Sequence, residues 1–272
     1  MSNFKDFFEN IDKEKVNEYM KNKFKGKKPK PIIDDFSDVD SNDIDDALKG
    51  SSSEDGKIIN LSNMGLKSVP KKLPKTVEIL DISDNEISEL PDPKDYSNLK
   101  VINCSDNKIT TIPNYPNLVE LLCLYNEIDS ISSIENLVIL DCSYNELRDL
   151  PKFPKLKILI CPGNGLTRIR NYPELEELYC HCNKIDHISE MNKLIKLDCN
   201  RNNLTRLPKS NSLKLVWCYD NEIDKISNVP NVEEIFCDEK KVNKMSKKIG
   251  ENCLGKKENN NIAQYKFKAK IK

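Results

Sequence analysis

The sequence predicts a mostly β solenoid of the α/β class, in which about ten short turns of chain stack and share one parallel sheet. Cysteine recurs every nineteen residues from Cys104 to Cys237, and asparagine follows three residues after seven of these eight cysteines. Apolar residues alternate with others, as in Leu121-x-Cys123, and this two-residue period is typical of a strand. A repeat this short cannot bury its apolar side alone, so its turns must stack.

The first segment, residues 1–56, predicts a short helix followed by a charged linker. Phe4, Phe7, Phe8 and Ile11 recur at helical spacing, which favours a helix over roughly residues 3–24. This helix could cap the first repeat, bind a partner or lie on a membrane surface, and the pattern leaves all three open. The lysine-rich and then acidic stretches that follow are interpreted as a solvated linker.

The repeat domain is predicted to span residues 57–250. One unit reads Leu99-x-x-Ile102-x-Cys104-x-x-Asn107-x-Ile109, and its positions are numbered here from Leu99. In a strand, positions four and six point into the core, while three, five and seven point outward. Prolines after many units, such as Pro113 and Pro116, favour an extended or polyproline return path over a helix.

This unit resembles the signature of the leucine-rich repeat family, L-x-x-L-x-L-x-x-N/C-x-L, and the match covers most of the chain. The first unit has Met64 and the last has Lys240 at the asparagine position, as expected of atypical end repeats. The resemblance implies a horseshoe with a concave parallel sheet. In their shortness the repeats are similar to those of bacterial effectors and of repeat proteins of amoebae and large DNA viruses.

Position nine predicts a ladder of structural asparagines. The sharp corner after each strand leaves backbone groups that need hydrogen-bond partners. We expect each amide to bond backbone groups of its own turn and of the adjacent turn. The ladder comprises Asn85, Asn107, Asn126, Asn145, Asn164, Asn183, Asn202 and Asn221.

Position six predicts a column of buried thiols. Parallel strands would hold the cysteines about 4.8 Å apart, whereas disulfides need Cβ separations of about 3.5 to 4.5 Å. We interpret the cysteines as small core residues, with a disulfide or a metal site as less favoured alternatives. The sequence predicts no metal site and no cofactor.

Residues 251–272 predict a lysine-rich cap or tail. Lysine alternates with apolar residues from Tyr265 to Ile271, which favours a last strand that protects the edge of the sheet. A basic arm for nucleic acid or anionic lipid, or a disordered tail, are the alternatives.

The outward positions hold large apolar and aromatic side chains where a solvated strand would be polar. Such a surface indicates a partner-binding face, unless a terminal segment folds over it. The candidate binding residues are Leu122, Leu124, Tyr125, Tyr144, Ile160, Tyr179, His181, Trp217, Tyr219 and Phe236.

An enzyme is not expected, because the chain has only two histidines, His181 and His187, and no catalytic, phosphate-binding or metal-spaced motif. We interpret it as a non-enzymatic scaffold for protein-protein interaction. One alternative is a substrate-recognition adaptor for a partner enzyme such as a ubiquitin ligase. Another is a nucleic-acid or membrane adaptor that acts through the lysine-rich segments. The sequence does not predict which protein is the partner, nor the oligomeric state.

The expected location is the cytoplasm, or a host cytoplasm for a viral or effector protein. No apolar run is long enough to span a membrane, and the start, Met1-Ser2-Asn3-Phe4-Lys5, lacks the apolar core of a signal peptide. The formal net charge of -1 gives no reason to expect that the whole chain binds polyanions.

Overall fold

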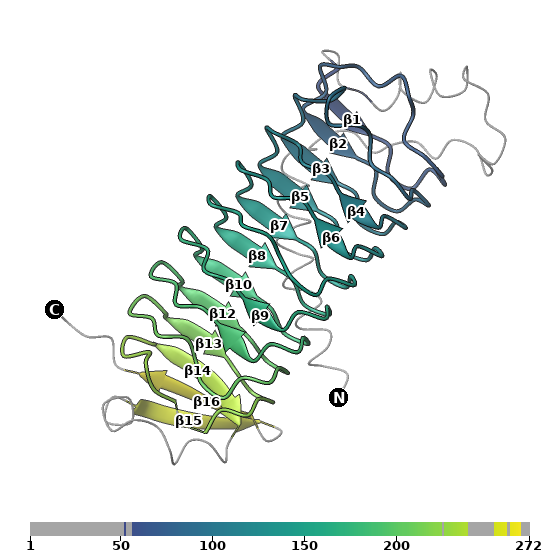
Figure 1. Cartoon of the computed structure of the whole chain (residues 1–272). Coiled ribbons are helices and arrows are strands. Elements are labelled where there is room, and N and C mark those ends of the chain that lie inside the picture. Colours follow the sequence, from purple (N-terminus) through teal and green to yellow (C-terminus); the bar gives the residue numbers. More distant parts are fainter. Residues whose placement is uncertain (1–51, 53–55, 225, 239–252, 260–261, 268–272) are drawn as a thin grey trace. The chain divides into compact units, whose positions relative to one another are not determined.

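A computed structural model describes residues 52, 56–224 and 226–238, and the backbone of residues 253–259 and 262–267. Its main feature is a sheet with the strand order β1-β2-β3-β5-β7-β8-β10-β12-β13-β14-β16-β15 (Figure 1). The first ten strands in this order pair in parallel. The predicted leucine-rich-repeat type of solenoid is therefore confirmed, and nine connections join its ten parallel strands. These strands are β1 (Ile58–Asn60), β2 (Ile79–Asp81), β3 (Val101–Asn103), β5 (Glu120–Leu122), β7 (Ile139–Asp141), β8 (Ile158–Ile160), β10 (Glu177–Tyr179), β12 (Lys196–Asp198), β13 (Leu215–Trp217) and β14 (Glu234–Asp238).

The pairing register keeps equal repeat positions next to each other. Leu121 pairs with Leu140, and Leu140 pairs with Leu159. These leucines occupy position four, and all three are fully buried, as is Cys142 at position six. The alternation of the sequence therefore becomes one continuous apolar column along the stack, which no single turn could bury alone.

The return path is extended, as the prolines predict. Short strands pair there as two further small sheets, β4 with β6 and β9 with β11, on the opposite side of the turns from the main sheet (Figure 1). Within the described ranges no segment of the return path is helical. Tyr172 lies buried beneath this side, where its hydroxyl donates to the carbonyl oxygen of Pro151 at 3.1 Å. The four short strands are β4 (Thr111–Ile112), β6 (Ser130–Ile131), β9 (Arg168–Ile169) and β11 (His187–Ile188).

Each asparagine at position nine joins two successive turns. The side chain of Asn145 accepts from the amide of Ile128 at 2.9 Å and donates to the carbonyl oxygen of Cys123 at 2.9 Å. It also donates to the carbonyl oxygens of Cys142 and Ser143 in its own turn. The same pattern recurs at Asn85, Asn107, Asn126, Asn164, Asn183, Asn202 and Asn221.

Position eight turns the corner with a left-handed backbone. Tyr144 has a φ of 52°, and Gly163 in the next turn has a φ of 66°. This conformation aims the amide of Tyr144 at the carbonyl oxygen of Pro162, one turn on, at 2.8 Å. It also places the position-eight side chains at the rim of the sheet. The other residues at this position with positive φ are Asn63, Asp84, Asp106, Tyr125, Cys182, Arg201 and Asp220.

Antiparallel segments meet both ends of the parallel stack. Ser52 forms an antiparallel bridge with Ile59 at the first strand. At the other end β16 (Ile262–Phe267) pairs antiparallel with β14, and β15 (Cys253–Asn259) pairs with β16. The lysine-rich segment thus contributes β16, the strand next to the last repeat. The expected helix over residues 3–24 and the charged linker lie outside the described residues.

The cysteine ladder lies in the core. All eight ladder cysteines are buried thiols, and Cys182 is a half-buried thiol. Burial raises the pKa of the Cys142 and Cys180 thiols well above the ordinary value, because a thiolate would have to give up its hydration. These side chains therefore act as small apolar residues.

Candidate functional site

The sheet face is defined here as positions three, five and seven of strands β1 to β14. Three of its candidate binding residues are buried and not exposed as the sequence suggested: Leu122 is 1% exposed, Ile160 6% and Tyr179 7%. Tyr144, at the rim of this face, is 40% exposed. The remaining candidates are half-buried, namely Leu124, Tyr125, His181, Trp217, Tyr219 and Phe236. Among these candidates, most of the accessible side chains thus lie at the rim and towards β13 and β14.

Two aromatic pairs on or beside the sheet face stack between neighbouring turns. The rings of Tyr125 and Tyr144 lie 4.7 Å apart, centroid to centroid, with 8° between their planes. Trp217 and Phe236, at position five of β13 and β14, lie 5.4 Å apart with 12° between their planes. The strand spacing of about 4.8 Å brings equal positions to stacking distance. In each pair the two rings therefore pack against each other.

The Tyr125–Tyr144 stack depends on a glycine in the next turn. A Cβ atom at Gly163 would lie 2.5 Å from Cδ1 of Tyr144, so the tyrosine ring occupies the space that a side chain at position 163 would need. The sequence frame had placed both tyrosines on the outward strand face. The structure places them at the corner that follows the strand.

Acidic and amide side chains at position five bond the residue at position seven. Asp141 accepts from the amide of Ser143 at 3.0 Å and from its hydroxyl at 2.5 Å. Asp81 is bonded in the same way by Ser83. Asp141 lies between Leu122 and Ile160 in the register and is 3% exposed. Burial raises the pKa of its carboxyl to about 6, although the Ser143 hydrogen bonds oppose the shift.

A second polar group lies on β10 and β12. Glu177 accepts from the hydroxyl of Tyr179 at 2.7 Å and from Nζ of Lys196 at 2.7 Å. Nδ1 of His181 lies 3.0 Å from Oδ2 of Asp198, whose side chain is 1% exposed. Sequence reasoning placed His181 among the candidate binding residues and missed its contact with Asp198. The pair could have been predicted by comparing position seven of one repeat with position five of the next repeat.

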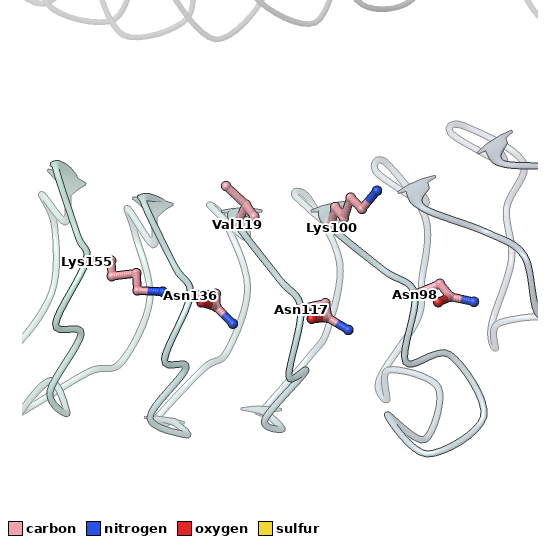
Figure 2. A pocket seen from close by; sticks show the side chains of 6 residues that line it. All are labelled: Asn98, Lys100, Asn117, Val119, Asn136 and Lys155. Carbon is pink, nitrogen blue, oxygen red and sulfur yellow. Dashed lines mark hydrogen bonds between the residues drawn. The ribbon is translucent and has the colours of Figure 1, made fainter.

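A shallow depression of about 430 Å³ lies beside the start of the strands. Figure 2 shows its lining, in which the side-chain amide nitrogens of Asn98, Asn117 and Asn136 each point towards the preceding turn. Asn117 Nδ2 donates to the carbonyl oxygen of Ser97 at 2.9 Å, and Lys155 Nζ donates to Oδ1 of Asn136 at 2.7 Å. These donors already bond the chain itself, which makes the depression a poor candidate for a site. Its lining residues are Asn98, Lys100, Asn117, Val119, Asn136 and Lys155.

The described residues also bear on metal sites and on membrane spans. No three His, Cys, Asp or Glu side chains among them gather as a metal site would require. No helix in the described ranges is both long enough and apolar enough to cross a membrane.

Comparison with known proteins agrees with the stacked turns. The family model described as leucine-rich repeats in two copies matches residues 75–117, which include β2 and β3. The chain is a leucine-rich repeat protein. Solenoids of this family are typically scaffolds for protein interaction and not enzymes.

Similar solved structures come from bacterial effectors. YopM, a leucine-rich effector protein from Yersinia pestis, is 25% identical with a TM-score of 0.58, over 65% of this leucine-rich repeat chain and 53% of YopM. A Shigella effector leucine-rich repeat domain is 26% identical with a TM-score of 0.46, over 61% of this chain and 69% of that domain. The repeats thus resemble those of YopM in fold.

One curated relative also matches part of the chain. Leucine-rich repeat and WD repeat-containing protein 1 of Xenopus tropicalis is 40% identical over 75 residues, which is 25% of this chain and 11% of the relative. The chain therefore spans about one ninth of that relative and about half of YopM.

Proposed function

We propose that this protein is a non-enzymatic recognition scaffold that binds a protein partner through its sheet face. The observation that supports this most is the Trp217–Phe236 stack, half-buried at the β13 and β14 end of the face. Large aromatic side chains held rigid at a surface gain little for folding but carry much of the binding energy when a partner covers them.

The rim stack of Tyr125 and Tyr144 adds a second anchor. It lies beside the same sheet and presents one ring that is 40% exposed. One stack is on β13 and β14 and the other is next to β5 and β7, so a partner that touches both must span at least four strand spacings, from β7 to β13. This is about 19 Å, a length that suits a protein surface or an extended segment better than a small molecule.

A cytoplasmic location is part of the proposal. All nine cysteines with described side chains are thiols, and the reducing cytosol keeps thiols in this state. The eight ladder cysteines are buried, which also protects them from oxidation.

The test is partner capture by the full chain and by matched variants. Trp217→Ala should weaken capture by about 2 kcal/mol, roughly thirtyfold. Arg206→Ala, an exposed return-path residue, is the control and should capture as the wild type does. Partners would be crosslinked, identified and then titrated as purified proteins. A partner that binds both variants equally well would place the binding site elsewhere and overturn the proposal.

A further inference from the structure

The sheet face carries a charge that the chain as a whole does not. Its positions three, five and seven hold seven carboxylates and one lysine, Lys196, which gives a formal net charge of -6 among the described residues. The whole chain has a formal net charge of only -1. The excess of positive charge therefore lies outside positions three, five and seven of these strands. The carboxylates are Asp81, Glu120, Asp141, Glu177, Asp198, Glu234 and Asp238.

The lysines at the neighbouring edge do not neutralise this face. At position two, Lys100 pairs with Glu78 at 2.5 Å and Lys214 pairs with Glu233 at 2.6 Å. These ion pairs lie along the start of the strands, and within each pair the charges of the lysine and the glutamate cancel. Lys196 is bonded to Glu177 at 2.7 Å, and Lys266 of β16 stands opposite Glu234 in the register. These two lysines offset only two of the seven carboxylates.

Carboxylates and aromatic rings alternate over β10 to β14. In the register, Asp198 at position five lies between Tyr179 and Trp217, and Trp217 lies next to Phe236. Glu234 and Asp238 flank Phe236 on its own strand and are half-buried. A cationic side chain is attracted both to the face of an aromatic ring and to a nearby carboxylate. Asp198 is buried, so Glu234 and Asp238 are the accessible carboxylates that make this arrangement fit a cation better than an anion.

We propose that the β10 to β14 part of the sheet face binds a protein segment rich in arginine and lysine. This inference rests on the proposed function and names the chemistry of its partner. The cations would lie over the Trp217 and Phe236 rings and against Glu234 and Asp238. The same charge disfavours nucleic acid and anionic membranes as ligands of this face, because their phosphates would meet carboxylates.

The experiment titrates the full chain with a fluorescent peptide of leucine and arginine and with its leucine and glutamate twin. The face variant combines Glu177→Gln, Glu234→Gln and Asp238→Asn, which remove three charges without changing side-chain size. The control variant removes three exposed carboxylates from the loops through Glu146→Gln, Asp186→Asn and Glu222→Gln. Circular dichroism establishes that both variants fold.

The face variant should bind the arginine peptide roughly tenfold more weakly than the wild type, and the control should bind it unchanged. The glutamate twin should not bind the wild type. An equal loss in both variants would reduce the effect to general electrostatic attraction and overturn the proposal.

Other occupants would give different results. Concentration-dependent dimerisation that the face variant abolishes would assign the face to a second copy. Tight competition by a peptide of residues 3–24 would assign it to the chain itself. Either result would overturn the proposal that a separate cationic partner binds this face. A captured protein that needs Trp217 but has no basic segment would overturn only this inference and leave the proposed function intact.

Discussion

Nδ2 of Asn145 lies 2.9 Å from the carbonyl oxygen of Cys123 in the preceding turn. Because Oδ1 of the same side chain accepts from the amide of Ile128, one amide ties the end of a strand to the corner before it. The asparagine is 8% exposed, so water is a poor substitute for these bonds. The stability of each corner thus depends on a buried polar side chain.

Asn145→Ala should lower the free energy of unfolding by about 1 to 3 kcal/mol, because it leaves buried backbone groups without a partner. Glu146→Ala changes the exposed neighbouring residue and should stay within about 0.5 kcal/mol of the wild type. Urea unfolding followed by circular dichroism measures both. Equal midpoints for the two variants would contradict the role of the ladder.

The nine cysteines with described side chains should divide into one accessible thiol and eight protected ones. Cys182 is half-buried at a corner beside Arg201, whereas the eight ladder thiols are buried. A brief treatment with maleimide, mapped by mass spectrometry, should label Cys182 and spare Cys104 to Cys237 at the ladder positions. Cys182→Ser should remove that label. Labelling of Cys161 at the same rate would mean that the core opens readily.

Gly163→Ala should destabilise the protein by about 1 to 3 kcal/mol. Its φ of 66° is only part of the reason, because Tyr144 and Cys182 adopt a similar φ at the same repeat position. The larger effect is the new Cβ, which would lie 2.5 Å from the ring of Tyr144. Gly65→Ala is the matched control, since Gly65 has a φ of 64° and its Cβ would meet no atom within 4 Å. Thermal melting of the two variants decides between backbone strain and ring clash.

The stability of the protein should depend on pH through Asp141. Its folded-state pKa is raised from 3.8 to about 6, so the native state binds more protons than the unfolded chain between these values. The stabilisation that this carboxyl contributes to the folded state is therefore fully present below about pH 4 and is lost as the pH rises to about 6. The loss at neutral pH is of the order of 3 kcal/mol, at 1.36 kcal/mol per pKa unit.

Asp141→Asn should remove this dependence. Relative to the wild type, the variant should be more stable at pH 7.5 than at pH 4.5, as measured by urea unfolding. Asp129→Asn, at an exposed return-path residue, should show no such difference. An Asp141→Asn variant that is equally stable relative to the wild type at both pH values would show that the carboxyl is not held in an apolar environment.

The repeat period predicted the fold because it determines the pairing. Once Cys123 and Cys142 occupy the same position nineteen residues apart, parallel strands in register are the arrangement that buries both. The alternation also predicted which side chains point away from the core. It did not predict that Leu122 and Ile160 would be buried there, because a period gives direction but not the neighbours that cover a side chain.

The polar contacts of the site were harder to predict for a related reason. The His181–Asp198 pair joins position seven of one repeat to position five of the next, a diagonal that a search within single repeats does not consider. The Tyr125–Tyr144 stack depends on the left-handed corner at position eight. Nothing in the residue type indicates that corner, because tyrosine rarely adopts a positive φ.

Tryptophan fluorescence should report on the sheet face, because Trp217 is the only tryptophan in the chain. Its ring is half-buried and stacks on Phe236 at 5.4 Å, so acrylamide should quench its emission partly, less than for a free indole in water. Trp217→Phe should melt close to the wild type, while Phe236→Ala should lose about 0.5 to 1.5 kcal/mol from the stack and make Trp217 easier to quench. A saturating cationic peptide should shift the emission of the wild type to the blue. Emission that the peptide leaves unchanged, despite measured binding, would place the bound peptide away from β13 and β14.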